Sequence, residues 1–501
     1  MTDTDAFRAR LGENPDGVYL DNLLNPEFEI LREHFFGPQM LLNRAHVLML
    51  AEVGLLGDDD AGRILSVFDE VAEAGVPESI TGADFEGVHF YVESRLIDEL
   101  GERVGGVLQT GRSRTDVYDA ACRLIARELL LDVAEAHAVL RTSILDTAAE
   151  VTDAVTTGYT HSQPAQPMTL AHYLLAFDHA LERDFRRLRA AYENTNQNPL
   201  GAAVLGGTGF EIDRDRLSEL CGFSSLCYNT YDATATMDFA PEAMNGVALL
   251  MATVSRVARD LIDWSTFEYG YLELSDAYAS VSSMMPQKKN PYSLEKVRST
   301  ASDAIGASTA TLTHLKGSPY GDVSEVAKYV LLPMLERTDE TARVLRLLAG
   351  VVDTMTVNED RMRENAERNF CTMTEVADTL VREEGISFRQ AHETVGTMVS
   401  AVIADGREAD EITLDDLNAA AEAVLGGPTG LSATGLQDAL DPVVNVERRN
   451  IPGGTAPECN EEDLRRQRES LHEELEWLDD ATEMLDDAAA ERRQLSERYV
   501  D

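Results

Sequence analysis

The chain has 501 residues, and its 89 aspartates and glutamates against 43 lysines and arginines give a formal net charge of −46 at pH 7. A field of this sign repels nucleic acid and anionic membrane surfaces, so we exclude both as partners. No stretch approaches the roughly 20 apolar residues of a membrane span, and the acidic N-terminus lacks the pattern of a secretion signal. We therefore expect a cytoplasmic protein with more than one domain.

Lysine is rare in this chain. An acidic, lysine-poor surface stays soluble in concentrated salt, because salt screens its self-repulsion. The composition therefore favours a halophilic source, with an ordinary acidic protein as the alternative. All lysines lie between residues 288 and 328, which predicts a functional region there. They are Lys288, Lys289, Lys296, Lys316 and Lys328.

The cysteines are odd in number and show no spacing typical of a metal site. A free cysteine packs as a small apolar side chain, so we expect buried free thiols. The five are Cys122, Cys221, Cys227, Cys371 and Cys459.

Helical periodicity dominates the sequence in chain order. Over 116–151, Ile125, Leu129, Val133 and Leu140 share one face, at the spacing of an amphipathic helix. Several long helices in succession predict an all-α protein built on a central bundle. Further helical runs are expected at 168–193, 240–270, 291–315 and 323–351.

Breaks rich in Gly, Pro and Asn predict loops at helix ends. We divide the chain into an N-terminal helical domain (1–110), a central helical bundle (111–355) and a C-terminal helical domain with an acidic tail (356–501). The charged segment from residue 460 is either a helix that docks on the rest or a solvated tail. The breaks lie at 104–115, 157–168, 196–213, 285–291 and 317–322.

The first break that can carry chemistry holds Arg112, Ser113 and Arg114, just before the long helix. Guanidinium groups and the free N–H groups at a helix start both favour a carboxylate. The arginines either bind a substrate or pair with structural acids.

The second such break places His161 between Thr160 and Ser162, followed by Gln163. A histidine among hydroxyls and amides can transfer protons. The alternative is a loop histidine that only makes structural hydrogen bonds.

The third break combines Ser282 and Ser283 with a proline turn and a Gln-Lys-Lys-Asn run that ends at Asn290. These residues offer a base together with cationic and amide groups that stabilise negative charge. Glu295 follows on the next helix, where it can orient a base. A generic basic turn would not need these residues in this order.

The residue order in 282–291 resembles the signature of the aspartase/fumarase superfamily. Its Gln-Lys-Lys-Asn version, together with 158–167, is similar to the argininosuccinate lyase family. The matches cover most of the chain in the same order. The others are Arg112-Ser113-Arg114, Pro199-Leu200-Gly201, Asp232-Ala233-Thr234, 388–393 and 453–457.

The resemblance implies an aspartase/fumarase-like helical protein of three domains, with a central bundle of long helices. It further implies a homotetramer in which each active site draws loops from three subunits. The expected reaction eliminates fumarate from a small N-substituted aspartate, and for argininosuccinate the other product is arginine. No metal or organic cofactor is implied.

The family's mechanism gives Ser282 the role of the base that removes the Cβ proton. Lys288 and Asn290 would stabilise the enediolate that forms, because a proton beside a carboxylate is barely acidic otherwise. Thr160 and His161 would act near the leaving nitrogen. The remaining expected site residues are Glu295, which would hold His161, and the substrate contacts Arg112, Ser113, Arg114, Gln163 and Ser283.

The residues expected to bind the amine half of the substrate depart from the family pattern. Thr115 and Val117 replace the usual Asn and Gln, 318–325 lacks a Tyr-Asn-Lys/Arg-Asp segment, and the usual serine near Phe28 is absent. Each unmade buried hydrogen bond costs about 1–3 kcal/mol. Three interpretations stay open: argininosuccinate lyase, a lyase of the same family that releases a different amine, and a catalytically silent paralogue.

Overall fold

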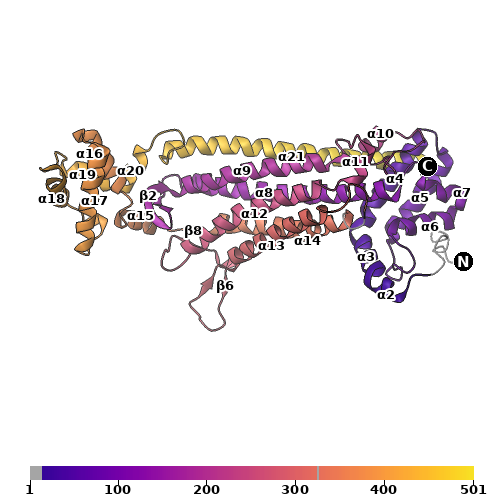
Figure 1. Ribbon diagram of the computed structural model, residues 1–501, viewed down its shortest axis with the longest axis horizontal. Coiled ribbons are helices and arrows are strands. Elements are labelled where there is room, and N and C mark those ends of the chain that lie inside the picture. The colour runs from indigo at the N-terminus through magenta and orange to yellow at the C-terminus, as the bar shows by residue number, and fades with distance from the viewer. Residues whose placement is uncertain (1–13, 324–326, 501) are drawn as a thin grey trace.

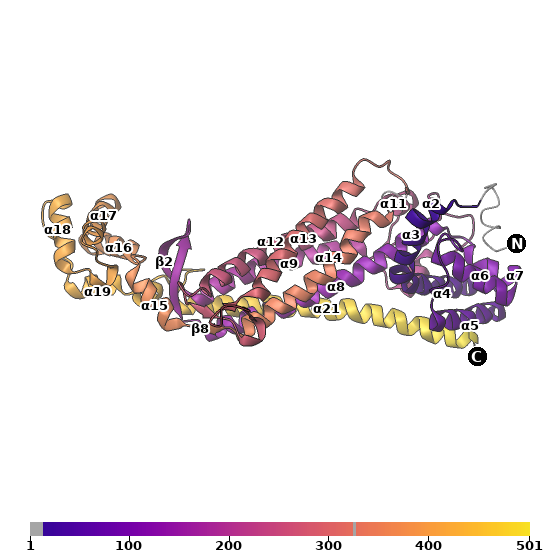
Figure 2. The same ribbon diagram turned by 90° about the horizontal axis from the view of Figure 1, so that it is seen from below.

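The computed structural model describes residues 14–323 and 327–500, which form an elongated helical molecule (Figure 1). Long helices run along its length, and shorter helices gather at the two ends (Figures 1 and 2). The predicted all-α fold is confirmed. No helix within the described residues is long and apolar enough to cross a membrane.

Short helices form the end of the molecule that holds the N-terminal part of the chain. They pack around α4, whose residues Leu42, Leu48 and Met49 are fully buried. The elements are α2 (Gly17–Tyr19), η1 (Leu20–Leu24), α3 (Asn25–Ile30), η2 (Leu31–Phe35), α4 (Phe36–Glu52), α5 (Asp58–Ala74), α6 (Val88–Leu100), α7 (Glu102–Gly105) and η3 (Gly106–Gln109).

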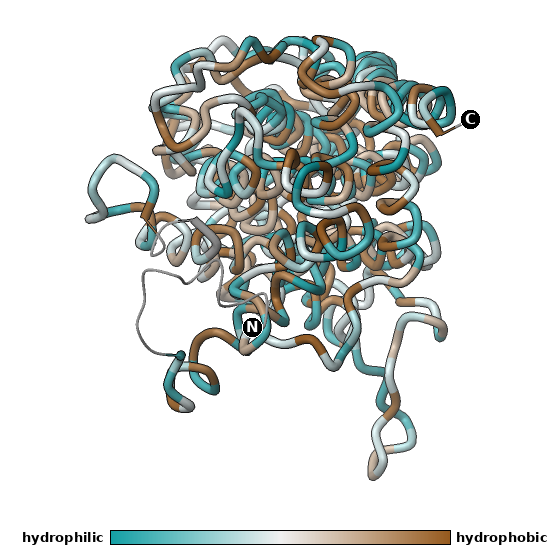
Figure 3. Tube along the Cα trace, turned by 90° about the vertical axis from the view of Figure 1, so that its right-hand side faces the viewer, coloured by the Kyte–Doolittle hydropathy of each residue, from teal (hydrophilic) through white to brown (hydrophobic). Residues whose placement is uncertain are grey.

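Five long helices form the bundle and match the five runs expected from periodicity, although residues 324–326 of the run at 323–351 lie outside the described residues. They are α8 (Arg114–Glu150), α9 (Leu170–Thr195), α12 (Phe239–Trp264), α13 (Tyr292–Leu315) and α14 (Ala327–Thr354). In the end-on view of Figure 3, hydrophobic and hydrophilic stretches alternate along the helical trace, as expected of helices with one buried face.

Short elements connect the bundle helices. The strands form only two-stranded pairs: β1 with β2, β3 with β4, β5 with β8 and β6 with β7 among the described residues. Their bounds are β1 (Val155–Thr160), β2 (Gln163–Thr169), β3 (Gln197–Asn198), β4 (Ser225–Leu226), β5 (Leu272–Glu273), β6 (Ser280–Val281), β7 (Lys289–Asn290) and β8 (Thr356–Val357), and the helical connections are α10 (Arg214–Cys221), α11 (Thr230–Ala235) and η4 (Asp276–Tyr278).

Helices α15 to α20 form the opposite end of the molecule (Figure 1). Most of them share a separate core that includes Val376, Leu380 and Met398, whereas one continuous core joins the N-terminal end to the bundle. The domain boundaries at 110 and 355 stay a prediction. These elements are α15 (Glu359–Arg368), α16 (Met373–Glu384), α17 (Phe388–Ala404), η5 (Ala409–Glu411), α18 (Leu414–Leu425), α19 (Ala433–Leu440) and α20 (Pro442–Arg448).

The C-terminal helix α21 (Pro457–Val500) returns along the bundle to the N-terminal end (Figures 1 and 2). It buries Leu471 and Leu478 in the main core, while Leu475 faces solvent. Arg141 of α8 pairs with Glu474 of α21 at 2.7 Å, deep in the interior. The segment is therefore a docked helix, and the solvated tail was the wrong alternative.

The break expected to be a loop over 157–168 is instead a β-hairpin of β1 and β2. Pairing runs from Val155 opposite Thr169 to Thr160 opposite Gln163, with an irregularity at Gly158. The loop prediction was wrong because Pro164 and Pro167 lie within the paired strands, where they do not break the hairpin. Proline is tolerated at the edges of sheets, and a hairpin has two of them.

Candidate active site

Residues 282–288 form a loop between β6 and β7 that projects from the bundle (Figures 1 and 3). Ser280 pairs with Asn290, and Val281 pairs with Lys289. The residues just beyond these pairs are Ser282 and Lys288. The hairpin register therefore brings the predicted base and the predicted charge-stabilising lysine to the two sides of the loop's neck.

The hydroxyl of Ser282 points at the backbone of its own loop. Its Oγ accepts hydrogen bonds from the backbone N–H of Met284 at 3.3 Å and of Met285 at 3.0 Å. N–H groups held in place around one oxygen stabilise negative charge on it. The loop therefore favours the alkoxide that a serine base requires, and Ser283 beside it is exposed.

The two adjacent lysines differ in their partners. Lys289 Nζ donates to Glu273 Oε1 at 2.9 Å and pairs with Asp276 Oδ1 at 2.7 Å. These carboxylates raise the pKa of Lys289 above its usual value. The ammonium of Lys288 is exposed and makes no hydrogen bond or ion pair with any described residue. Lys288 is the one of the two that can meet charge on a substrate.

His161 and Ser162 form the two-residue turn of the β1–β2 hairpin. Their φ angles are +52° and +60°, as a type I′ turn requires at both positions. Non-glycine residues in this region carry backbone strain, which proteins often keep at functional sites. The turn holds the side chains of Thr160, His161 and Gln163 exposed at the tip.

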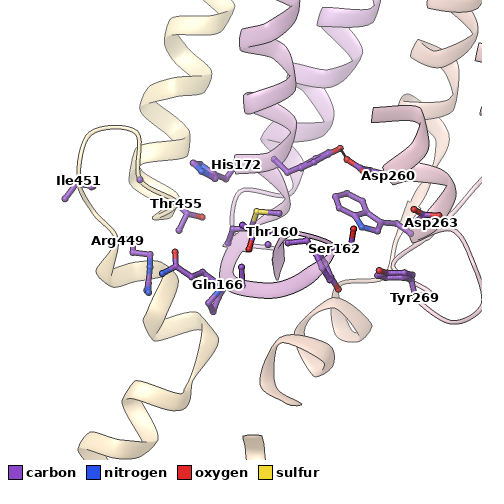
Figure 4. A pocket seen from close by; sticks show the side chains of 18 residues that line it. Thr160, Ser162, Gln166, His172, Asp260, Asp263, Tyr269, Arg449, Ile451 and Thr455 are labelled. Atoms are coloured by element: carbon purple, nitrogen blue, oxygen red, sulfur yellow. Dashed lines mark hydrogen bonds between the residues drawn. The ribbon is translucent and has the colours of Figure 1, made fainter. Parts of the chain in front are cut away.

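A cavity of about 790 Å³ lies beside the hairpin, between its strands, the end of α12 and the segment before α21 (Figure 4). Of the predicted site residues only Thr160 lines it. Thr455, in the predicted motif at 453–457, accepts a hydrogen bond from the backbone N–H of Thr169 at 3.0 Å. That motif therefore anchors the hairpin to the start of α21.

Glu295 lies in the first turn of α13, and its side chain is exposed. Within the described part of a single chain, it makes no hydrogen bond or ion pair with His161. The contact between these two residues stays a prediction that a second chain would have to fulfil.

Ser113 is the N-cap of α8 and forms a capping box with Asp116. The other oxygen of Asp116 accepts hydrogen bonds from the backbone N–H of Gly201 at 3.0 Å and of Ala203 at 2.9 Å. Burial raises the pKa of Asp116 to about 6, although these donors lower it. The motifs at 112–114 and 199–201 thus form one structural unit.

The arginines on either side of Ser113 point in different directions. Arg112 is turned inward and donates to Asn43 Oδ1 at 2.7 Å, and burial lowers its pKa to about 10. Arg114 is exposed, lies 3.9 Å from Glu86 and stacks over the ring of Phe90. Arg114 is therefore the arginine that can reach a substrate from this chain, while Arg112 holds the loop in place.

A second cavity, of about 320 Å³, opens beside this loop, and we call it the Thr115 pocket. Thr115 Oγ1 donates to Asp322 Oδ2 at 2.9 Å at its edge. Its wall is polar and rich in carboxylates, with leucines contributing the apolar part. The polar lining includes Glu27, Glu86, Arg114, Thr115, Asp119 and Asp322.

The predicted site residues do not meet within one chain. Arg114 begins α8, and the β1–β2 hairpin follows its C-terminal end. A helix of 37 residues is about 55 Å long. One small substrate cannot contact both ends of α8 in the same chain, so the loop at 112–114 and the β1–β2 hairpin of a single chain cannot serve the same substrate.

Comparison with known proteins gives one consistent result. A family model described as lyase matches residues 39–306, and one described as argininosuccinate lyase C-terminal matches residues 370–447. The argininosuccinate lyase of Methanosarcina barkeri is 41% identical over 84% of this chain and 85% of its own length. Argininosuccinate lyase 1 of Shouchella clausii is 36% identical over 89% and 90%. The chain belongs to the argininosuccinate lyase family.

The family is one of carbon–nitrogen lyases that act on small molecules, and this chain is such an enzyme. A solved variant of EDDS lyase with bound fumarate is 34% identical, with a TM-score of 0.87 over 99% of this chain and 98% of its own. Fumarate lyases and a fumarase at 14% to 19% identity share the fold alone. The predicted family and the aspartase/fumarase-like fold are confirmed.

Sequence reasoning missed Asp119 and Asp322, which line the Thr115 pocket, and Asn43, which holds Arg112. Asp119 is nearly fully buried, although the charge count suggested only a solvated acidic surface. One signal was available in the sequence: the helical spacing puts Asp119 near the apolar face of α8, where an acidic side chain is unusual. No local signal identifies Asn43, because it contacts Arg112 across 69 residues.

Proposed function

We propose that this enzyme eliminates fumarate from argininosuccinate and releases arginine. The observation that carries the proposal is the 282–288 loop. It holds the Ser282 hydroxyl against two backbone N–H groups and leaves Lys288 without a partner among the described residues. A serine base and a free ammonium at one loop neck suit removal of a proton next to a carboxylate.

In the proposed reaction the Ser282 alkoxide takes the proton from Cβ of the succinyl group. The electron pair of the C–H bond moves into the adjacent carboxylate, which becomes an enediolate with two negative charges. Lys288 and Asn290 stabilise these charges by an ion pair and a hydrogen bond. The pair then returns to form the double bond, and the C–N bond breaks with its electrons on nitrogen.

The guanidinium of argininosuccinate becomes a neutral guanidine when the C–N electrons move to its nitrogen, and it gains one proton to form the guanidinium of arginine. An amine that enters unprotonated must gain its proton as the C–N bond breaks. Thr160 and His161, at the tip of the strained hairpin turn, are the groups assigned to this step, with Glu295 holding the imidazole. Ser113, Arg114, Gln163 and Ser283 are assigned to the substrate. Arg112 acts on the substrate through the loop that it holds, because its guanidinium is bonded to Asn43.

These roles require several copies of the chain. Because the two ends of α8 are about 55 Å apart, the loop with Arg112, Ser113 and Arg114 and the hairpin of the same chain serve different sites. A homotetramer with sites shared among subunits satisfies the requirement. Analytical ultracentrifugation tests it. If sites are shared, mixing the impaired Ser282→Ala and His161→Asn chains should give more activity than either variant alone.

The second candidate is elimination of fumarate from another N-substituted aspartate. Two observations favour it: the departures at 115–117 and 318–325, and the likeness to EDDS lyase over nearly the whole chain. The two candidates share every step on the succinyl half. They differ only in the amine that leaves.

The absorbance of fumarate's conjugated double bond tests both candidates in high-salt buffer. Fumarate from argininosuccinate supports the first, and adducts formed only from fumarate and other amines support the second. Ser282→Ala should lower kcat by about a thousandfold or more. Full activity of that variant would contradict the mechanism. If the wild-type protein shows no activity with any substrate, it is a catalytically silent paralogue.

We also propose that the enzyme works in a salt-rich cytoplasm. The net charge of −46 and the presence of only five lysines support the salt-rich environment. Five free cysteines, four of them buried, suit a reducing compartment such as the cytoplasm. Thermal unfolding in KCl tests the salt dependence: Tm should rise with KCl concentration up to molar levels. An unchanged Tm would leave an ordinary acidic protein as the better interpretation.

A further inference from the structure

The β1–β2 hairpin is fixed to the rest of the molecule at its base. Asn369 Nδ2 donates a hydrogen bond to Thr157 Oγ1 at 2.8 Å, and the backbone N–H of Thr169 donates to Thr455 Oγ1 at 3.0 Å. Both contacts lie on the base side of the irregularity in the strand pairing. They hold the strands where these leave the bundle, but they do not reach the turn that carries His161.

The pairing of the two strands is interrupted before the turn. Gly158 and Tyr159 are consecutive, yet Ala165 is left without a partner between their two pairings, and Tyr159 lies opposite Pro164. An unpaired residue disrupts the ladder locally and bends the strand, and a proline has no N–H to donate. Residues 159–163, which we call the hairpin tip, are therefore joined to the base by weakened backbone pairing.

The hairpin tip needs support, because His161 and Ser162 have φ angles of +52° and +60°. Strained residues of this kind persist only where their surroundings hold them. The side chain of Tyr159 supplies such a contact: its hydroxyl oxygen lies 3.0 Å from that of Tyr271, within hydrogen-bond distance. Its ring packs edge to face on Tyr269, which lines the cavity beside the hairpin (Figure 4). Among the described residues, no other hydrogen bond joins the tip to another element.

Tyr271 is a rigid anchor for this contact. Its side chain is fully buried, and its ring lies between those of Trp264 and Tyr269, with centroids 6.3 Å and 5.4 Å away. Its backbone N–H donates to the carbonyl of Trp264 at 3.0 Å, and its carbonyl accepts from the N–H of Asn358 at 2.9 Å. Because backbone and ring are both fixed, the Tyr271 hydroxyl gives Tyr159 a defined place to bind.

We propose that Tyr271 is a positioning residue, which through Tyr159 fixes the hairpin tip so that His161 meets the leaving nitrogen of the substrate. The inference rests on the proposed lyase function, which assigns His161 to proton transfer. Such a transfer needs heavy atoms about 2.6–3.2 Å apart, so a small displacement of the tip slows this step. Burial raises the pKa of the Tyr159 hydroxyl above its usual value, so this phenol stays protonated and acts only as a hydrogen-bonding group.

Tyr271→Phe removes the hydroxyl and keeps the ring. We expect kcat for fumarate release to fall about three- to tenfold while KM stays within about twofold, since one hydrogen bond is lost. Tyr159→Phe should give the same loss, and the double variant should be no worse than either, because both changes remove one shared bond. Full kcat in both single variants, or losses that multiply in the double variant, would overturn the proposal.

Tyr173→Phe is the matched control. Its hydroxyl donates to Asp260 at 2.6 Å, between α9 and α12, so this variant also loses a phenol hydrogen bond but leaves the hairpin contact intact. We expect kcat of the control to equal that of the wild type. An equal loss in Tyr173→Phe and Tyr271→Phe would show a general effect of removing a hydroxyl and would refute the specific role of Tyr271.

A cycle with His161→Asn separates positioning from a merely structural role. In that background Tyr271→Phe should change kcat by less than about twofold, because the group that it positions is absent. A structural defect would lower kcat by the same factor in both backgrounds, and that result would overturn the proposal.

Amide hydrogen exchange of the peptide 158–167, followed by mass spectrometry on the full chain, gives a readout that needs no turnover. Exchange should be about three- to tenfold faster in Tyr271→Phe than in the wild type and unchanged in Tyr173→Phe. Unchanged exchange in Tyr271→Phe would refute the anchor even if kcat fell. A wild-type protein without fumarate release would instead contradict the proposed function, so the two failures are distinguishable.

Discussion

Thr115 Oγ1 donates a hydrogen bond to Asp322 Oδ2 at 2.9 Å and joins two segments that are 207 residues apart in the chain. Both segments depart from the family pattern in sequence, at 115–117 and at 318–325. The structure brings Thr115 and Asp322, one residue from each segment, to one acidic pocket, whereas residues 324 and 325 lie outside the described residues. Thr115 and Asp322 therefore share one local environment.

Loss of the Thr115 hydroxyl tests this contact. Thr115→Val keeps the shape of the side chain and removes the donor to Asp322, so kcat/KM for argininosuccinate should fall about three- to tenfold, mainly through KM. Steady-state assays of fumarate release measure it. Thr142→Val, which removes a hydroxyl that bonds within the same helix, is the control. An equal loss in both variants would argue for a general effect on α8.

The adjacent lysines of the projecting loop give a second, internally matched test. Lys288→Met should lower kcat by about a hundredfold or more, because the enediolate loses its counter-charge. Lys289→Met should retain most of the activity, since its ammonium is occupied by Glu273 and Asp276. Fumarate absorbance at saturating substrate measures both variants. The assignment fails if Lys289→Met is the more damaging change.

Substitutions in the turn of the β1–β2 hairpin distinguish a chemical role of His161 from a role in backbone geometry. Asn tolerates positive φ, so His161→Asn should keep the hairpin while kcat drops about a hundredfold. Ser162→Gly should raise stability slightly, because glycine adopts φ +60° without strain. Circular dichroism and kcat measure the two effects. If His161→Asn retained full kcat, the histidine would be a structural turn residue only.

A buried charge network predicts a pH effect on stability. Arg141 of α8 bonds both Asp178 of α9 and Glu474 of α21, all with buried side chains. Burial raises the pKa of Glu474 from 4.5 to about 7, although Arg141 lowers it. The folded state then binds more protons than the unfolded chain between these values, so this contribution to stability decreases as pH rises through that window.

Glu474→Gln should remove that part of the pH dependence. The unfolding free energy of the wild type minus that of the variant should decrease by up to about 3 kcal/mol from pH 4.5 to above pH 7. Urea unfolding at fixed salt measures it. Glu473→Gln, at the exposed neighbouring position, should leave the profile unchanged. A constant difference across the pH range would show that Glu474 does not titrate there.

Much of the fold could be predicted because its signals are local. Apolar residues three and four positions apart specify each long helix, and all five predicted runs are helices. The hairpin at 155–169 was missed because its prolines act as breakers in a local pattern. Its strands are stabilised by each other, and by Thr455 near the C-terminal helix, which no local pattern contains.

The sequence by itself determined the family and the chemistry on the succinyl half, because Ser282, Lys288 and Asn290 lie within nine residues of one another in a single hairpin segment. Tertiary structure decided which of two neighbouring charged side chains is exposed. Lys289 and Arg112 are occupied by partners brought in from elsewhere, whereas Lys288 and Arg114 remain exposed. It also decided the Thr115 pocket, since Thr115, Asp119 and Asp322 acquire a common environment only when α8 packs against a segment 200 residues away.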